Sequence, residues 1–373
     1  MNHTLLSWPL LVILAAAPAL AQGEPASEWP LFRGDSVASG VARTPLPEKF
    51  ELAWSYRLEK GAFENTPAVV DGVVYAADAD GHVLALKLED GSELWKREFD
   101  TGFLASPAVR DGRIYVGDYD GMFHCLSTKD GSELWNYETE AEIDSSANFY
   151  QGNVLVGSQD AKLYCLDAAK GTEVWKYEIE DQVRCSPTIV EDRVFLAGCD
   201  SKLHILDLKT GESVGEVPIE APTGVTPAVH GDRVFFGTEA GTFFAIDWKK
   251  AEVAWSAVED RGSPSIRSSA AVDPRLVVYG SRARKLRALD PEKGTELWSF
   301  PTRQPVDGSP IIAGDRVFFG AGDGNVYAVD IKTGEKLWNY EAGGRFLSSP
   351  AAAAGRLLIA SDNGAIYCFA APK

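Results

Sequence analysis

The sequence predicts an all-β fold: an eight-bladed β-propeller of four-stranded antiparallel blades, with the N-terminal strand completing the C-terminal blade. A Ser/Thr-Pro dipeptide, or Ser-Ala in two places, recurs every 40 residues apart from one step of 43. Each interval holds four short apolar runs separated by turn residues, and the two chain ends supply complementary parts of one unit. Four short strands in about 40 residues, repeated around a ring, are typical of propeller blades. The eight repeats begin at Thr66, Ser106, Ser146, Ser186, Thr226, Ser269, Ser309 and Ser349.

The repeat at 106–138 shows the order of elements within one blade. The run SPAV opens it, the turn Asp111-Gly112 leads to RIYVG, DYDG leads to MFHCL, and ELWNYE closes it. Asp-Gly between apolar runs indicates a tight hairpin, because the favoured turns require positive φ. The opening proline belongs at the start of an edge strand, since it cannot donate a hydrogen bond. We therefore expect the first run to be the innermost strand.

The two ends of the chain predict how the ring closes. The last repeat stops at 367–369 after three strands, and LAWSYRLE at 52–59 is a spare fourth strand. Pairing the two would complete the eighth blade and leave no unpaired strand edge where the ring closes.

An eleven-residue frame ends most repeats, as in CLSTKDGSELW (125–135) and CLDAAKGTEVW (165–175). The glycine supplies the turn into the fourth strand, and the tryptophan that follows can bury a large face against the next blade. Two repeats depart from the frame, with Gly215 in place of the tryptophan and Ala251 in place of the glycine. We expect a looser contact there, or another side chain filling it. The predicted docking residues are Trp54, Trp95, Trp135, Trp175, Trp255, Trp298 and Trp338.

This frame resembles the tryptophan-docking motif of the eight-bladed propellers of the pyrroloquinoline quinone (PQQ) type, across residues 50–373. The segment EWPLFRGDSVASGVA (28–42) is similar to the N-terminal segment of secreted members. The resemblance implies one of two functions. The BamB-like branch is a non-catalytic scaffold that binds proteins or ligands, with a role in envelope protein assembly. The quinoprotein alcohol dehydrogenases bind PQQ and a divalent metal.

We take the scaffold function as the prediction and a PQQ-dependent oxidoreductase with Ca²⁺ as the alternative. The chain has few insertions and no adjacent cysteine pair, whereas the dehydrogenases it resembles have long insertions and usually such a pair. We assign no catalytic, cofactor-binding or metal-binding residues and expect no cofactor. One insertion of three residues, in VEDRGSPSIR between Trp255 and Ser269, is expected to enlarge a loop on the face where the strands begin.

The binding face is predicted from the residues two positions before each repeat start. These should surround the mouth of the central channel, either as a site for a small polar ligand or peptide or as a solvated rim with local ion pairs. They are Glu64, Leu104, Asp144, Arg184, Gly224, Arg267, Asp307 and Leu347. Arg282 and Arg284, in the basic run SRARKLR, form a second candidate for docking by charge complementarity, or a solvated outer edge.

Aspartates in the turns between the second and third strands, such as Asp78, Asp80, Asp118 and Asp120, could suggest Ca²⁺ ligands. We interpret them as turn residues, because they lie on separate blades. Cys185 and Cys199 fall one residue out of register across a hairpin, so a disulfide between them requires a bulge. The tripeptide Arg33-Gly34-Asp35 is interpreted as incidental.

The N-terminus predicts export. An apolar run from Leu5 to Ala21 ends in Ala-Leu-Ala, which is typical of a signal peptide, here residues 1–21, cleaved after Ala21. There is no cysteine near the cleavage site, so we expect no lipid anchor. No later segment has membrane-spanning length. Residues 22–50 are expected to be an extended segment, and 51–373 a single propeller. The net charge of −18 disfavours nucleic acid, so we expect a periplasmic or extracellular monomer with a protein partner.

Overall fold

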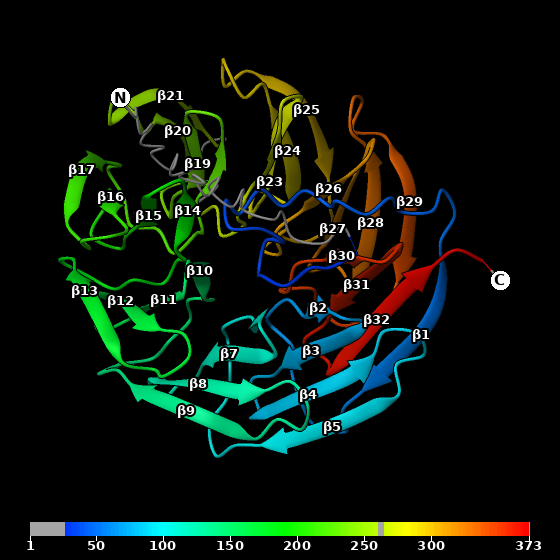
Figure 1. The fold of residues 1–373 in the computed structure, drawn as a ribbon. Helices are drawn as coiled ribbons and strands as arrows, with labels where there is room; N and C mark the ends of the chain where they lie inside the picture. The colour runs from blue at the N-terminus through cyan, green and yellow to red at the C-terminus, as the bar shows by residue number, and fades with distance from the viewer. Residues whose placement is uncertain (1–26, 260–264, 373) are drawn as a thin grey trace, which may run out of the picture.

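The computed structural model describes residues 27–259 and 265–372. Within these ranges the regular structure consists of strands alone, arranged as eight four-stranded antiparallel sheets in a ring (Figure 1). The predicted eight-bladed β-propeller is therefore confirmed. The predicted signal peptide and residues 260–264 of the segment that holds the expected insertion lie outside the described residues.

The first four blades follow one another along the chain, each numbered from its innermost strand outward. Blade 1 has β2 (Ala68–Val70), β3 (Val73–Ala77), β4 (His82–Lys87) and β5 (Glu93–Glu98). Blade 2 has β6 (Ala108–Arg110), β7 (Arg113–Gly117), β8 (Met122–Ser127) and β9 (Glu133–Glu138). Blade 3 has β10 (Asn148–Tyr150), β11 (Asn153–Ser158), β12 (Lys162–Asp167) and β13 (Glu173–Glu178). Blade 4 has β14 (Thr188–Val190), β15 (Arg193–Ala197), β16 (Lys202–Asp207) and β17 (Ser213–Pro218).

The next three blades repeat this order, and the eighth uses both ends of the chain. Blade 5 has β18 (Ala228–His230), β19 (Arg233–Gly237), β20 (Thr242–Asp247) and β21 (Glu252–Val258). Blade 6 has β22 (Ala271–Asp273), β23 (Leu276–Ser281), β24 (Lys285–Leu289) and β25 (Glu296–Pro301). Blade 7 has β26 (Ile311–Ala313), β27 (Arg316–Gly320), β28 (Asn325–Asp330) and β29 (Lys336–Glu341). Blade 8 has β30 (Ala351–Ala353), β31 (Arg356–Ala360), β32 (Ala365–Ala370) and, outermost, β1 (Glu51–Arg57).

The ring closes as predicted, by pairing the first strand of the chain with the last. Strand β1 is antiparallel to β32, with Ser55 opposite Tyr367. In Figure 1 the blue and red ends of the chain lie side by side in this blade. Because both ends of the chain share one sheet, opening the ring at blade 8 requires breaking a β-ladder.

A circle of hydrogen bonds explains why each repeat opens with serine or threonine. The backbone N–H of each of these residues donates to the side-chain hydroxyl of its counterpart one blade further on. The eight distances are 2.9–3.2 Å, and the bond from Ser349 N to Thr66 Oγ1 closes the circle. Each buried N–H is thereby satisfied across a blade boundary, where no strand could supply a partner.

The segment before β1 lies on the inner edges of the blades. Carbonyl groups of residues 29–40 accept hydrogen bonds from N–H groups on β2, β6, β14, β18, β22 and β26, at 2.8–2.9 Å. In blade 3, the side-chain amide of Asn148 donates to Ser36 O at 2.9 Å. In Figure 1 this dark blue segment lies inside the ring of blades. The segment therefore covers inner strand edges that would otherwise be unpaired.

Six blade boundaries share one tryptophan contact. The indole N–H of each docking residue donates to a carbonyl in the following blade, as from Trp135 to Ala168 O at 3.2 Å. The indole also lies against the turn glycine of that blade. A Cβ built on Gly171 would come within 2.5 Å of Trp135, and Gly171 has φ +71°. Equivalent hydrogen bonds are made by Trp54, Trp95, Trp175, Trp255 and Trp298.

The boundary between blades 4 and 5 lacks this contact. Here a tryptophan of the following blade packs against the preceding blade. A Cβ on Gly215 would meet the Cβ of Ala251 at 3.4 Å, an ordinary contact distance. Trp248 of blade 5 packs instead against Phe195 of blade 4, with ring centroids 5.6 Å apart. The two sequence departures thus belong to one interface, because without an indole the turn has room for a methyl group.

The boundary between blades 7 and 8 is also different, because β32 leads to the end of the chain. Trp338 packs against Phe50, with ring centroids 5.6 Å apart, and against Phe369 at 5.2 Å. Phe50 comes immediately before β1. The N-terminal part of the chain therefore completes blade 8 and also covers Trp338, the docking tryptophan of blade 7.

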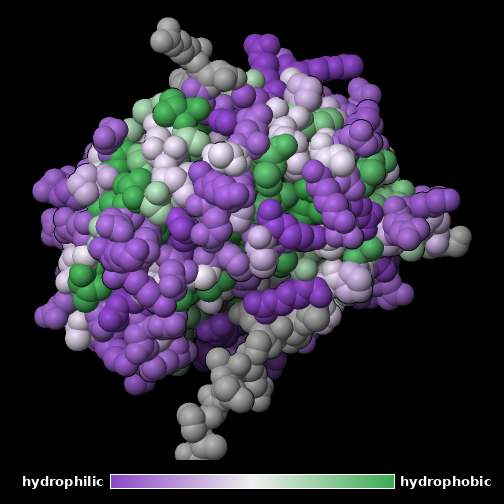
Figure 2. Space-filling view, turned by 90° about the horizontal axis from the view of Figure 1, so that it is seen from above, coloured by the Kyte–Doolittle hydropathy of each residue, from purple (hydrophilic) through white to green (hydrophobic). Residues whose placement is uncertain are grey.

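The outer rim exposes isolated apolar side chains. The outermost strand of each blade has a register shift, as between Trp95 and Glu93 in blade 1, where the residue between them, Leu94, is left without a cross-strand partner. Such bulges at an outer edge discourage pairing with another chain. In Figure 2, which views the ring from the side, apolar residues form separate spots on a largely polar surface. The exposed large apolar residues on these strands are Leu52, Leu94, Leu134, Val174, Val214, Val253, Val258, Leu297 and Leu337.

All five cysteines are free thiols. Cys185 is buried, and the thiol of Cys199 lies 3.7 Å from Thr223 O. The structure therefore has no disulfide between Cys185 and Cys199.

Candidate functional site: the mouth of the central channel

One cavity of about 340 Å³ occupies the channel mouth, and it gathers the residues that precede the repeat starts. All eight of those positions line it, although they lie some 40 residues apart in the chain. Their charged members are Glu64, Asp144, Arg184, Arg267 and Asp307. The cavity also takes in Asn65 and Glu239, which sequence reasoning missed, because their repeat positions carry no common residue type.

The N-terminal segment provides the inner wall of this cavity. Phe32 lines it, and the neighbouring Arg33 is 1% exposed. The Arg33 guanidinium donates to the carbonyl oxygens of Ala270 at 3.2 Å and Pro310 at 2.5 Å. Burial lowers the pKa of Arg33 to about 9, although the charge of Asp35 opposes this shift. Arg33 thus fastens the segment to blades 6 and 7, and its tripeptide is not a surface motif.

Carboxylates from blades 1 to 3 make one side of the cavity acidic. Burial, and then the charge of Asp362, raise the pKa of Glu64, while Arg345 opposes the shift. Glu142 lies beside Asp144, and burial together with that negative neighbour raises the pKa of Glu142 to about 7. Asp144 accepts a hydrogen bond on Oδ2 from Gln159 at 2.9 Å. This side of the cavity thus favours a cation or a hydrogen-bond donor.

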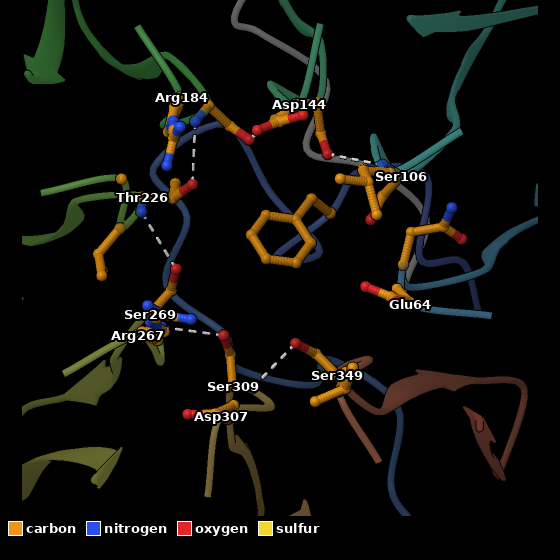
Figure 3. A pocket seen from close by; sticks show the side chains of 18 of the residues that line it. Glu64, Ser106, Asp144, Arg184, Thr226, Arg267, Ser269, Asp307, Ser309 and Ser349 are labelled. Atoms are coloured by element: carbon orange, nitrogen blue, oxygen red, sulfur yellow. Dashed lines mark hydrogen bonds between the residues drawn. The ribbon is translucent and has the colours of Figure 1, made fainter. Parts of the chain in front are cut away.

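Two arginines from blades 4 and 6 face this acidic side. In Figure 3, Arg184 and Arg267 lie across the cavity from Glu64. Arg267 has Glu239 at 3.8 Å, which partly offsets its charge. Among the residues that the structure describes, no carboxylate lies within 4 Å of the exposed Arg184 side chain, so its guanidinium is available to an anionic group.

The basic run of blade 6 is largely neutralised by nearby carboxylates. Arg282 lies 3.1 Å from Asp307, which brings Arg282 to the channel mouth as a partner of a lining residue. Arg287 pairs with Glu259 at 2.9 Å and Glu296 at 2.7 Å. Arg284 is exposed. The run is therefore a weaker docking candidate than its sequence suggests.

The turn aspartates bind neighbouring side chains on their own blades. Asp118 lies 2.9 Å from His124 Nε2, and Asp200 lies 2.8 Å from His204 Nε2. Asp160 accepts a hydrogen bond from Tyr164 at 2.6 Å. Within residues 27–259 and 265–372, no group of three or more His, Cys, Asp or Glu side chains is placed to hold a metal ion. These contacts give the turn aspartates a structural role.

The fold and the cavity define a class of protein: a closed eight-bladed propeller with a cavity lined by charged residues at its channel mouth. The sequence matches the family described as outer membrane protein assembly factor BamB over residues 51–149, 142–258 and 263–371. The chain belongs to that family. BamB of Yersinia pestis is 38% identical over 93 residues, a match that spans 22% of each protein.

Solved structures show the same fold in proteins of different function. BamB from Moraxella catarrhalis superposes with a TM-score of 0.72 at 19% identity, over 87% of this chain and 98% of that one. Quinohemoprotein alcohol dehydrogenase from Comamonas testosteroni gives 0.79 at 17% identity, over 93% and 81%. A europium-containing methanol dehydrogenase gives 0.80 at 14% identity, over 93% and 99%. At these identities the likeness establishes the fold alone.

The cavity does not fit PQQ, the cofactor implied by the quinoprotein resemblance. PQQ is a planar polycarboxylate, which requires cationic partners and flat faces for stacking. The lining contributes more carboxylates than guanidinium groups, and Phe32 is its one aromatic residue. The carboxylates are Glu64, Asp144, Glu239 and Asp307, against Arg184 and Arg267.

No helix in the described part of the chain combines the length and hydropathy needed to cross a membrane.

Proposed function

We propose that this protein is an exported, non-catalytic scaffold of the cell envelope that binds a protein partner, in the manner of BamB. The observation that carries the proposal is the family match, which extends over all eight blades rather than over a single repeat. The apolar N-terminal run supports export.

The physical properties of the propeller suit a docking role. A ring closed by a strand ladder and by hydrogen bonds between all neighbouring blades presents its mouth as a rigid surface, so little conformational freedom is lost on binding. Charged groups of both signs around the mouth can select a partner of complementary charge. The net charge of −18 favours a partner surface with an excess of Lys and Arg.

The test begins in the cell that produces the protein. Deleting the gene should lower the amount of folded outer-membrane protein, and the wild-type gene should restore it. Affinity purification should recover one partner in stoichiometric amount. Replacing Glu64 and Asp144 with Lys should abolish that recovery, because the partner surface is expected to be basic, whereas Glu138→Lys, on the outer strand β9, should leave it unchanged. Unchanged outer-membrane protein levels together with no stoichiometric partner would overturn the proposal.

A second test addresses the oxidoreductase alternative. Purified protein titrated with PQQ and Ca²⁺ should show no stoichiometric change in tryptophan fluorescence and no alcohol-dependent reduction of a dye. Saturable quenching with dye turnover would show that the protein is an enzyme.

A further inference from the structure

The charges that line the cavity are of both signs, and this restricts what can bind there. Glu239 and Asp307 are offset by Arg267 and Arg282. Among the described residues, this leaves Glu64, Asp144 and Arg184 with no oppositely charged side chain within 4 Å. Figure 3 places Glu64 on one side and Arg184 with Arg267 on the other. A polyamine would place ammonium groups against the arginines, and a simple anion would lie near Glu64 and Asp144. Either ligand is opposed by half of the lining, whereas a molecule with one positive and one negative end matches both halves.

The acidic side also has acceptor atoms that lack a donor. Asn65 is 3% exposed, and its amide nitrogen donates to Phe103 O at 3.2 Å, but its Oδ1 has no hydrogen-bond partner among the described residues. The Oδ1 of Asp144 is likewise buried and unpartnered within that part of the chain. Buried acceptors without donors are costly, and both residues line the cavity. An ammonium group provides several N–H donors and can serve more than one such acceptor.

The wall between the two sides provides further donors. The hydroxyls of the repeat-opening residues accept a backbone N–H from the preceding blade, and each retains its own O–H to donate. Seven of these residues, from Ser106 to Ser349, line the cavity. Hydroxyl donors in a ring suit the carbonyl oxygens of a peptide backbone, which lie between its charged ends.

We propose that the channel mouth is a binding site for a short peptide with free termini. Its α-ammonium lies at Glu64, Asn65 and Asp144, and its α-carboxylate lies at Arg184 and Arg267. The cavity of about 340 Å³ is at the small end of the range for ligand sites, which suits a di- or tripeptide. The N-terminal segment pairs with the inner strands around the ring and contributes Phe32 to the lining, so it forms part of the wall that the peptide contacts. The peptide site lies at the same channel mouth as the proposed docking surface, but it does not rest on that role, because titration of the purified protein tests it with no partner present.

The experiment is isothermal titration of the purified mature protein with a set of tripeptides of the form Ala-Xaa-Ala. The controls are the same peptides with an acetylated N-terminus or an amidated C-terminus. We expect at least one free peptide to bind with one-to-one stoichiometry, and each cap to weaken binding at least tenfold. No heat from any free peptide at millimolar concentration, or equal binding of capped and free forms, would overturn the proposal.

Variants assign the two ends of the peptide. In Glu64→Gln/Asp144→Asn, the acetylated and free peptides should bind equally, because the ammonium no longer gains from the carboxylates. In Arg184→Gln/Arg267→Gln, the amidated and free peptides should bind equally. Glu138→Gln and Lys176→Gln, on the outer strands, should retain full discrimination, and thermal unfolding confirms that every variant is folded. If the cavity variants kept full discrimination between capped and free peptides, the assigned site would be wrong.

Discussion

The contact between a docking tryptophan and the turn glycine of the next blade can be tested by Gly171→Ala. Gly171 has φ +71°, and a Cβ there would come within 2.5 Å of Trp135. The left-handed backbone should cost about 1 kcal/mol, and overpacking against the indole about 1–3 kcal/mol more. We therefore expect the free energy of unfolding to fall by about 2–4 kcal/mol.

Blades 4 and 5 provide the design for the second arm, because Gly215 and Ala251 form this pair naturally. Trp135→Gly should itself cost about 2–4 kcal/mol, less than loss of a fully buried tryptophan, because the Trp135 indole is only partly buried. On that background Gly171→Ala should cost only the backbone part, about 1 kcal/mol. The coupling energy between the two sites should therefore be about 1–3 kcal/mol.

Urea unfolding followed by circular dichroism measures the four free energies of the cycle. Gly72→Ala is the matched control, since Gly72 has φ +73° and no heavy atom within 4 Å of its built Cβ. It should reproduce the backbone cost alone. If Gly171→Ala cost the same with and without Trp135, steric contact with the indole would not be the reason for the glycine.

Three further predictions concern other parts of the molecule. Burial beside Asp144 raises the pKa of Glu142 from its ordinary 4.5 to about 7, so the folded state loses stability as pH rises through this range. Glu142→Gln should raise Tm at pH 8 and have little effect at pH 4; an equal effect at both would contradict this. Arg33→Met should lower the free energy of unfolding, measured by urea titration, by about 2 kcal/mol or more, because hydrogen bonds from a charged donor to two blades are lost. Unchanged stability would show that Arg33 does not hold the N-terminal segment against the blades. Phe50→Ala should expose Trp338 and increase acrylamide quenching of tryptophan fluorescence; unaltered quenching would mean that another group covers the indole.

The sequence was sufficient for the blade count and for the closing strand. Asp-Gly turns and apolar runs act within a few residues, so their recurrence could be counted directly. The spare strand at 52–59 could be matched to the incomplete last repeat, because a blade needs four strands. The sequence also predicted which residues surround the channel mouth, because equivalent positions in a rotational repeat lie at the same distance from the ring axis and at the same height along it.

Other features depended on side chains meeting across blade boundaries. Trp248 lies in a turn, and its sequence does not indicate that it fills the space left by Gly215. Arg282 and Arg287 read as a basic surface, but carboxylates from other turns and strands neutralise them. These contacts join residues that have no fixed spacing in the chain.

By itself, the sequence determined the repeating unit, the number of units and the way the ring closes, because these follow from turn chemistry and strand pattern within 40 residues. The tertiary structure alone decided that Asn65 and Glu239 join the predicted mouth residues in one cavity, and that Arg267 is offset by Glu239. It also decided that the N-terminal segment forms the inner wall of that cavity. The physical reason is that charge balance, and the satisfaction of buried polar atoms, depend on distances through space that no local pattern specifies.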